Sequence, residues 1–198
     1  MELVSTKPMF TIGDIAAFAL GEADIPHLQR FFERNPEYFI TVGGDLPQHD
    51  TAKNEFFDRP PAEMPYDKVY VLGFLDAAGD LVAMTSLVEN LFAKHVWHVG
   101  LFVVATSLHG AGIAHAFYAA LEEWLQKQGA LWIRLGVVKG NVKAEGFWRR
   151  QQFVEVRCRH DVLIGKLTHT ISVMIKPVSD RDLNEYLKVV SRDQPDSS

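Results

Sequence analysis

The chain has 198 residues, of which 47% are hydrophobic and 23% charged, a composition that excludes a disordered, collagenous or coiled-coil protein. Twenty lysines and arginines against 25 acidic residues give a net charge of -5, so no overall field attracts nucleic acid or an anionic membrane. The single cysteine, Cys158, excludes an internal disulfide, and no apolar run reaches the roughly 20 residues of a membrane span.

The first predicted element is a helix that Asp24 caps and that ends at Asn35-Pro36. Its apolar face consists of Leu28, Phe31 and Phe32. The stretch 43–65 contains two adjacent glycines and four prolines, and we expect it to be a partly ordered excursion with a short helix at 51–57. Such excursions often border binding sites.

From Lys68 onward the pattern changes to strands. Segments 69–75 and 81–89 flank a Gly-Asp turn and predict a β-hairpin, and a third strand covers 95–105. A loop at 106–112 leads directly into a helix that begins at Ile113. The elements predicted after this helix are a strand at 131–137, a short helix capped by Asn141, hairpin strands at 153–164 and 167–176, and a helix at 179–190 with a Ser-x-x-Asp cap.

This order of elements predicts an α+β fold, with a mixed, mostly antiparallel twisted sheet of about six or seven strands flanked by helices. The β-α-β crossover should be right-handed. We expect a single domain over residues 1–190 with its core at 68–177, followed by a polar tail at 191–198 that frays from Arg192 onward.

The strongest functional signal lies between Phe102 and Ala114. Gly110 and Gly112 allow a sharp turn and a close approach to a ligand, and the helix that follows offers unpaired amides with a partial positive charge. Such a helix end suits a phosphate, although an ordinary tight turn has the same sequence features. A Walker A loop lacks its Gly-Lys-Ser/Thr here, and a dinucleotide fingerprint lacks its third glycine.

The segment His109-Gly110-Ala111-Gly112-Ile113-Ala114 follows a strand and resembles the Gln/Arg-x-x-Gly-x-Gly/Ala signature of the Gcn5-related N-acetyltransferase (GNAT) superfamily. A second block, from Asn141 to Phe153, resembles the family's Asn-x-x-Ala-x-x-Phe-Tyr-x-x-x-Gly-Phe segment. The two blocks occur in the family's order. The resemblance covers 68–177 and is strongest over 97–153.

This resemblance implies an N-acetyltransferase that moves an acetyl or other acyl group from acetyl-CoA to a primary amine by direct attack in a ternary complex. The pantetheine arm would pair with the strand at 102–104, which splays from the next strand at 135–138, and a strand amide would polarise the acyl carbonyl. The implied cofactor-binding residues are Phe102, Val103, Val104, His109, Gly110, Ala111, Gly112, Ile113, Ala114, Asn141, Ala144 and Trp148.

The sequence departs from the family's pattern at His109, Ala111, Trp148 and Gln152, where Gln or Arg, a basic residue, Tyr and Gly are usual. The missing basic side chains should weaken the affinity for CoA. Trp148 matters more, because the family's tyrosine is often the acid that protonates the departing thiolate and an indole NH releases no proton near pH 7. Either another group does so, or the thiolate leaves unaided with a pKa near ~8.5.

The acceptor amine needs a base or a water chain, because an alkyl ammonium has a pKa near ~10. His98 lies eleven residues before His109, at the position of the general-base glutamate in the histone acetyltransferase branch of the family, and an ordinary pKa near ~6.5 would suit the role. Glu89, at the end of the preceding strand, is the rival catalytic candidate. The alternatives are a packed histidine and a solvated hairpin charge.

Other functions have less support in the sequence. No histidine-acid arrangement supports an acyl-enzyme at Cys158, and the histidines lack a ligand spacing with carboxylates, so we expect no metal site. Glu2, Lys7 and Asp14 interrupt any signal-peptide core, and with the lone cysteine they favour the cytoplasm. We expect no nucleic-acid or membrane partner.

The resemblance leaves the acceptor open, as a small amine, an amino-acid derivative, or a protein N-terminus or lysine. Homodimers are common among relatives, so the last hairpin or the last helix is a candidate dimer surface. The alternative function is a non-catalytic acyl-CoA-binding module, regulatory or partner-binding, on the same fold.

Overall fold

The strands predicted between residues 68 and 177 form the centre of one twisted sheet in the computed structural model, which describes residues 7–195 except 111 and 179. Within these residues the sheet has eight strands, in the order β1 (Phe10–Ile12), β2 (Ile15–Ala19), β3 (Lys68–Leu75), β4 (Leu81–Glu89), β5 (Val96–Val104), β6 (Trp132–Val138), β8 (Leu167–Pro177) and β7 (Val154–Ile164). Among the described strands, only β5 and β6 pair in parallel. The α+β class and the mostly antiparallel sheet are confirmed.

The hairpin β1–β2 was not predicted from the sequence. Its first strand has three residues and its second contains three alanines, which have a low preference for strands. Packing supplies what the local pattern lacks, because the Phe10 ring lies 5.7 Å from the Phe74 ring and 5.9 Å from the Trp124 ring. This hairpin extends the sheet beyond β3.

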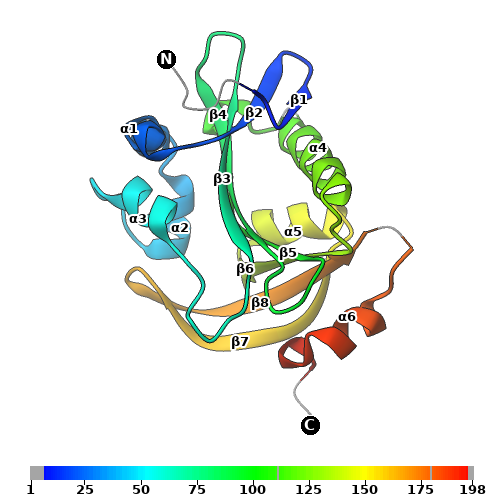
Figure 1. Ribbon diagram of the computed structural model, residues 1–198. Helices are drawn as coiled ribbons and strands as arrows, with labels where there is room; N and C mark the ends of the chain where they lie inside the picture. Colours follow the sequence, from blue (N-terminus) through cyan, green and yellow to red (C-terminus); the bar gives the residue numbers. More distant parts are fainter. Residues whose placement is uncertain (1–6, 111, 179, 196–198) are drawn as a thin grey trace.

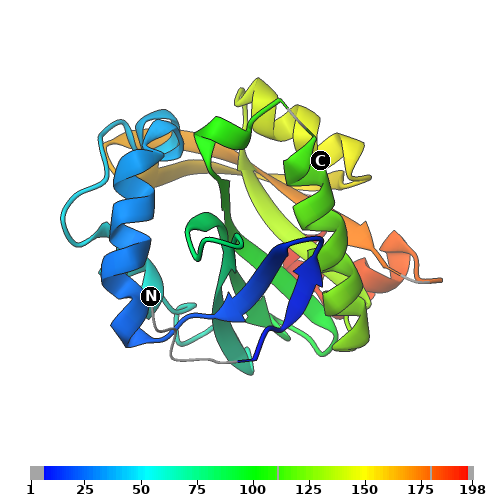
Figure 2. The same cartoon turned by 90° about the horizontal axis from the view of Figure 1, so that it is seen from above.

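The helices cover both faces of the sheet (Figures 1 and 2). One face carries α1 (Ile25–Arg34), α2 (Glu37–Gly43) and α3 (Thr51–Phe57), and the other carries α4 (Ile113–Lys127) and α5 (Val142–Arg150). The two faces bury separate apolar clusters, one around Phe32 and Met84 and one around Trp97 and Leu121. Helices therefore cover the sheet on both faces.

Several helix boundaries differ from the predictions. α2 was not predicted, and Asp24 accepts a hydrogen bond from the Gly21 amide at 2.8 Å instead of capping α1 with its side chain. The last helix, α6 (Leu183–Val189), begins later than expected, because Asp182 caps it by accepting from the Glu185 amide at 2.8 Å. The predicted cap residue Ser179 lies outside the described residues.

The segment after α6 is anchored rather than frayed. Asp193 accepts a hydrogen bond from Arg134 Nε at 2.7 Å, and the two side chains are only 2% and 7% exposed. Tyr186 of α6 donates its hydroxyl hydrogen to the same carboxylate. The predicted fraying is therefore wrong for Arg192 and Asp193, because a buried arginine of β6 holds this segment against the sheet.

Candidate active site

The parallel strands β5 and β6 separate halfway along their length. They pair only from Val96 with Trp132 to Val99 with Leu135. Gly100 is an extra residue in the ladder between β4 and β5, and such a bulge bends its strand. Beyond the bulge, β5 stays with β4 and β6 stays with β8, which confirms the predicted splay. Backbone groups that face the gap are thus available to an extended ligand.

The loop before α4 has the backbone geometry of an anion site. Gly110 and Gly112 have φ angles of 86° and 74°, which favour glycine, and a Cβ at either position would meet nothing within 4 Å. Toward the other described residues, the amides of Gly110, Gly112 and Ile113 donate no hydrogen bond. Ala111, also predicted to bind the cofactor, lies outside the described residues.

A cavity of about 800 Å³ joins this loop to the gap between the strands and to α5. Eight of the predicted cofactor-binding residues line it, namely Phe102, Val104, His109, Gly110, Gly112, Ala114, Ala144 and Trp148. Its volume lies in the upper part of the range for small-molecule and cofactor sites. The residues that the family signature singles out are therefore brought together around one space.

Three other predicted residues lie outside this lining. Val103 packs into the apolar cluster on the α1 face, and Ile113 packs beside Phe117 on the opposite face. Asn141 caps α5, because its Oδ1 accepts a hydrogen bond from the Ala144 amide at 3.2 Å. The structure gives these residues a supporting position around the cavity.

Basic side chains from α4 and α5 also line the cavity, and the sequence did not single out all of them. Lys143 and Arg150 are seven residues apart on α5 and share one of its faces, and His115 lies in the first turn of α4. His115 and Lys143 were not predicted from the sequence. Helical spacing from Phe147, four residues later on α5, is the signal that could have found Lys143. These groups supply the positive charge that Ala111 lacks.

His109 and Trp148 show how the departures from the family pattern are accommodated. The His109 Nε2 lies 3.0 Å from the carbonyl oxygen of Val104, so the ring links the loop to the end of β5. The Trp148 indole is 8% exposed, and its ring lies 5.9 Å from the Phe102 ring and 5.2 Å from the Tyr118 ring. None of the residues that line the cavity carries a phenol hydroxyl that could replace the usual acid.

A second cavity, of about 440 Å³, is lined by Gly100 at the bulge and extends toward α3, and the predicted base His98 lines it. His98 Nδ1 lies 3.4 Å from Arg134 Nη1, and because a guanidinium only donates, this ring nitrogen is the acceptor. Burial, reinforced by the charge of Arg134, lowers the pKa of His98 to about 3. The expected pKa near ~6.5 is therefore wrong.

The rival candidate Glu89 lies on the opposite face of the sheet. Its Oε2 accepts a hydrogen bond at 3.0 Å from the hydroxyl of Tyr70, whose ring packs 5.5 Å from the Trp97 ring. His98 follows Trp97 in β5, so the two side chains point to opposite faces. Glu89 lines neither cavity, and the structure does not bring it together with His98.

Glu55 on α3 is the carboxylate that does line the second cavity, and the sequence did not single it out. Burial raises its pKa, although a hydrogen bond with Ser86 opposes this effect. The Ser86 Oγ lies 3.0 Å from where a Cβ on Gly100 would be, so a larger residue there would require the Ser86 side chain to shift. The available signal was the position of Glu55 in a short helix within the excursion expected to border a site.

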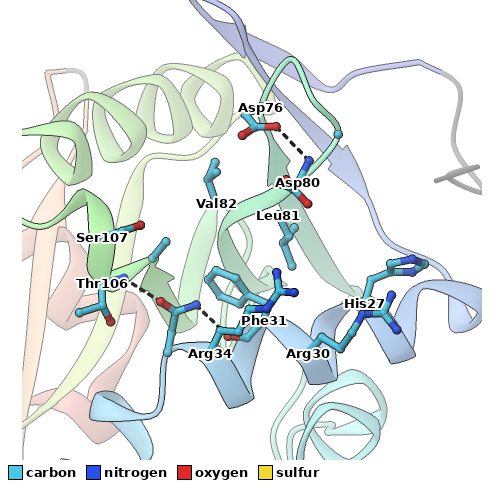
Figure 3. Close-up of a pocket in the computed structure, with 13 residues that line it drawn as sticks. His27, Arg30, Phe31, Arg34, Asp76, Asp80, Leu81, Val82, Thr106 and Ser107 are labelled. Carbon is cyan, nitrogen blue, oxygen red and sulfur yellow. Dashed lines mark hydrogen bonds between the residues drawn. The ribbon is translucent and has the colours of Figure 1, made fainter.

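A third cavity, also of about 440 Å³, lies between α1 and the turn that joins β3 to β4 (Figure 3). Arg30 and Arg34 line it from α1, and Asp76 and Asp80 line it from the turn. None of the predicted site residues belongs to it. Asn35 connects it to the loop region, because its Oδ1 accepts from the Thr106 amide at 2.7 Å.

Other kinds of site have no counterpart in the described part of the chain. It contains no group of three or more side chains arranged to hold a metal ion. Within residues 7–195, with residues 111 and 179 not considered, no helix is long and apolar enough to cross a bilayer.

Comparisons with known proteins agree with the fold. No curated protein sequence matches the chain. Among solved structures, an acetyltransferase from Thermus thermophilus is 18% identical, with a TM-score of 0.62 over 87% of this chain and 100% of that one. The spermidine N-acetyltransferase from Vibrio cholerae, in complex with CoA and spermine, is 16% identical, with a TM-score of 0.63 over 83% of this chain and 96% of that one.

A third structure, from Salmonella typhimurium, is an acetyl transferase that modifies the N-terminal serine of the ribosomal protein L7/L12. It is 14% identical, with a TM-score of 0.66 over 87% of this chain and 98% of that one. These identities support the fold alone. The sequence model of the acetyltransferase (GNAT) family matches residues 28–153, which is more than half of the chain and includes both predicted blocks. The chain therefore belongs to the GNAT family of acetyltransferases.

Proposed function

We propose that this GNAT acetyltransferase uses acetyl-CoA, or a related acyl-CoA, and transfers the acyl group to a primary amine. The observation that supports this most is the continuity between the amides at Gly110, Gly112 and Ile113 and the gap where β5 leaves β6. A diphosphate and an extended pantetheine chain need these two features in this order. An ordinary strand-to-helix turn needs neither a splay nor a cavity of about 800 Å³.

The residues present fit such a cofactor. The amides of the loop and the basic side chains of Lys143 and Arg150 would bind phosphates, while Phe102 and Phe147 offer apolar walls. When bound, acetyl-CoA supplies an activated acetyl group, which passes to the amine nitrogen as the carbon–sulfur bond breaks and CoA leaves as the thiolate. Peptide groups of β5 that face the gap would orient the pantetheine arm of the cofactor and polarise the acyl carbonyl.

The cavity that Glu55 and His98 line would hold the acceptor. It reaches the bulge at Gly100, where the strands part, so an amine there lies beside the gap from the side opposite the loop. Transfer would be direct. Cys158 lies on β7, where it donates to Glu155 Oε1 at 3.4 Å and accepts from Lys139 Nζ at 3.3 Å, and it lines none of the three cavities.

An acetyl-CoA titration followed by an assay of thiol release tests this proposal. We expect saturating acetyl-CoA to raise the thermal unfolding temperature, and thiol to be released when a primary amine is added. Gly112→Ala should weaken binding by at least tenfold, because a Cβ is placed where a phosphate must approach. Gly79→Ala is the matched control, since its φ of 82° imposes similar strain in the β3–β4 turn.

The outcomes separate the functions that the sequence left open. Stabilisation without thiol release across a panel of amines would favour the non-catalytic acyl-CoA-binding module. No stabilisation at all would overturn both functions, and equal losses of affinity in Gly112→Ala and Gly79→Ala would remove the loop from the site.

A further inference from the structure

The acceptor cavity carries opposite charges on opposite sides. Arg134 of β6, Arg159 of β7 and Arg192 of the C-terminal segment line one side. Glu55 and Asp58, from α3 and the segment after it, line the other. The remaining charged residue of the lining is Arg59, whose Nη1 donates to the backbone carbonyls of Phe56 at 3.0 Å and Asp58 at 2.6 Å. The Arg59 guanidinium therefore binds the backbone of its own segment.

The cationic side has more positive charge than its neighbours neutralise. The Asp193 carboxylate accepts two hydrogen bonds from Arg134, at 2.7 Å from Nε and 3.2 Å from Nη2. No described carboxylate forms an ion pair with Arg159 or Arg192. Burial and the nearby charges of Arg134, Arg192 and Arg157 lower the pKa of Arg159. The charge of Asp193 acts on both but already pairs with Arg134, so within a chain of net charge -5 two guanidinium groups without an ion pair of their own at one cavity indicate an anionic ligand.

An aromatic ring positions two of these guanidinium groups. The Arg192 guanidinium lies 4.3 Å from the centre of the Phe92 ring, and that of Arg134 lies 5.3 Å from it. Arg157 Nη1 donates a hydrogen bond to the backbone carbonyl of Arg192. The cationic side therefore combines the buried Arg134 with two exposed arginines, Arg159 and Arg192, of which Arg192 packs against Phe92.

The acidic side lies nearest to the reaction. Glu55 interacts with the Ser86 hydroxyl, and Ser86 in turn lies against Gly100 at the bulge. An ammonium group placed by Glu55 would therefore face the gap between β5 and β6. The arginines on β7 and the C-terminal segment come from the other side of the same cavity, so a single small ligand would reach both.

We propose that the acceptor is a small molecule that carries a carboxylate as well as the primary amine, with the carboxylate bound by Arg159 and Arg192 and the amine placed beside Glu55. This inference rests on the proposed function. A cavity of about 440 Å³ suits a ligand of amino-acid size. Of the two protons that the ammonium group loses, one goes to the departing CoA thiolate and the other leaves through Glu55.

A paired substrate panel tests the proposal. Each of several α- and ω-amino acids is assayed beside its own carboxamide, with saturating acetyl-CoA and detection of released thiol. We expect kcat/KM at least tenfold higher for the carboxylates. Arg159→Gln and Arg192→Gln should each reduce kcat/KM for the carboxylates about 10- to 100-fold and leave the carboxamides unchanged, because a charge-assisted hydrogen bond is lost.

Arg149→Gln is the matched control, because Arg149 is exposed, pairs with Glu145 at 4.0 Å and lines none of the three cavities. An undiminished stabilisation by acetyl-CoA shows that each variant is folded. Equal acetylation of carboxylates and carboxamides, or an equal effect of the arginine variants on both, would overturn the acceptor class while leaving the enzyme proposal intact. Stabilisation by acetyl-CoA without thiol release from any amine would overturn the enzyme proposal itself.

Discussion

Glu55 and His98, which line the same cavity, have pKa values shifted in opposite directions by the same cause. Burial disfavours the charged form of either group, so the pKa of Glu55 is raised and that of His98 is lowered to about 3. At neutral pH His98 is therefore a neutral imidazole that accepts a hydrogen bond from Arg134. Glu55 is a better proton acceptor than an ordinary glutamate, which makes it a third candidate base beside His98 and Glu89.

Substitutions at these three residues distinguish the candidates. We expect Glu55→Gln to reduce kcat about 10²- to 10³-fold near pH 7, because a positioned base typically contributes that much. His98→Ala should have a smaller effect, and Glu89→Gln should leave kcat unchanged, because Glu89 bonds to Tyr70 on the other face. Thiol release across a pH range is the measurement. A dominant loss in His98→Ala or in Glu89→Gln would return the role to that residue.

The sequence identified the loop glycines but not the environment of His98. Gly110 and Gly112 are recognisable because their positive φ angles are a local property of the backbone. The pKa of His98 depends on Arg134, which is 36 residues away and comes into contact only when β6 pairs with β5. Glu55 was missed for the same reason, because the helix that carries it meets Ser86 only in the folded chain.

At the scale of elements, strong local patterns were predicted and packing-dependent elements were not. The hairpin of β3 and β4, the helix after the glycine loop and the cap at Asn141 follow from apolar periodicity and turn residues. The hairpin of β1 and β2 depends on contacts of Phe10 with distant rings, so no local signal marks it. The splay was expected only through the family resemblance, and the bulge at Gly100 gives its physical basis.

The contact between β6 and the C-terminal segment depends on one buried ion pair, between Arg134 and Asp193, so a single substitution can remove that pair. Asp193→Asn leaves the buried Arg134 without a charged partner, which should reduce the free energy of unfolding by about 3–5 kcal/mol at pH 7. Urea unfolding measures this loss. Glu123→Gln, which breaks the exposed pair with Lys127, is the control and should leave the free energy of unfolding nearly unchanged.

The same carboxylate makes the stability depend on pH in a stated direction. Burial alone would raise the pKa of Asp193, but hydrogen bonds from Arg134 and Tyr186 outweigh it and lower the pKa. Its contribution is therefore fully present above the unfolded value of about 3.9, and is lost as the pH falls through the lower folded value. The difference between wild type and Asp193→Asn should shrink below about pH 4, and a constant difference from pH 7 to pH 3 would contradict this assignment.

At the scale of the whole molecule, β5 contributes to two cavities, with His98 and Gly100 lining one and Phe102 and Val104 lining the other. One cavity lies beside α5 and the glycine loop, and the other beside α3 and the C-terminal segment. Figure 2 shows α1 and α4 on opposite sides of the strands. This arrangement suits two reactants that approach one gap from opposite faces. A homodimer stays a prediction.

Amide hydrogen exchange, with and without acetyl-CoA, tests the central claim most directly, since it reports on the backbone groups that are assigned to the cofactor. We predict slower exchange at Gly110, Gly112 and Ile113 and in the segment 102–104, with no change at Gly165 in the β7–β8 turn. Unchanged exchange in the loop at saturating acetyl-CoA, or protection confined to other parts of the chain, would contradict the account.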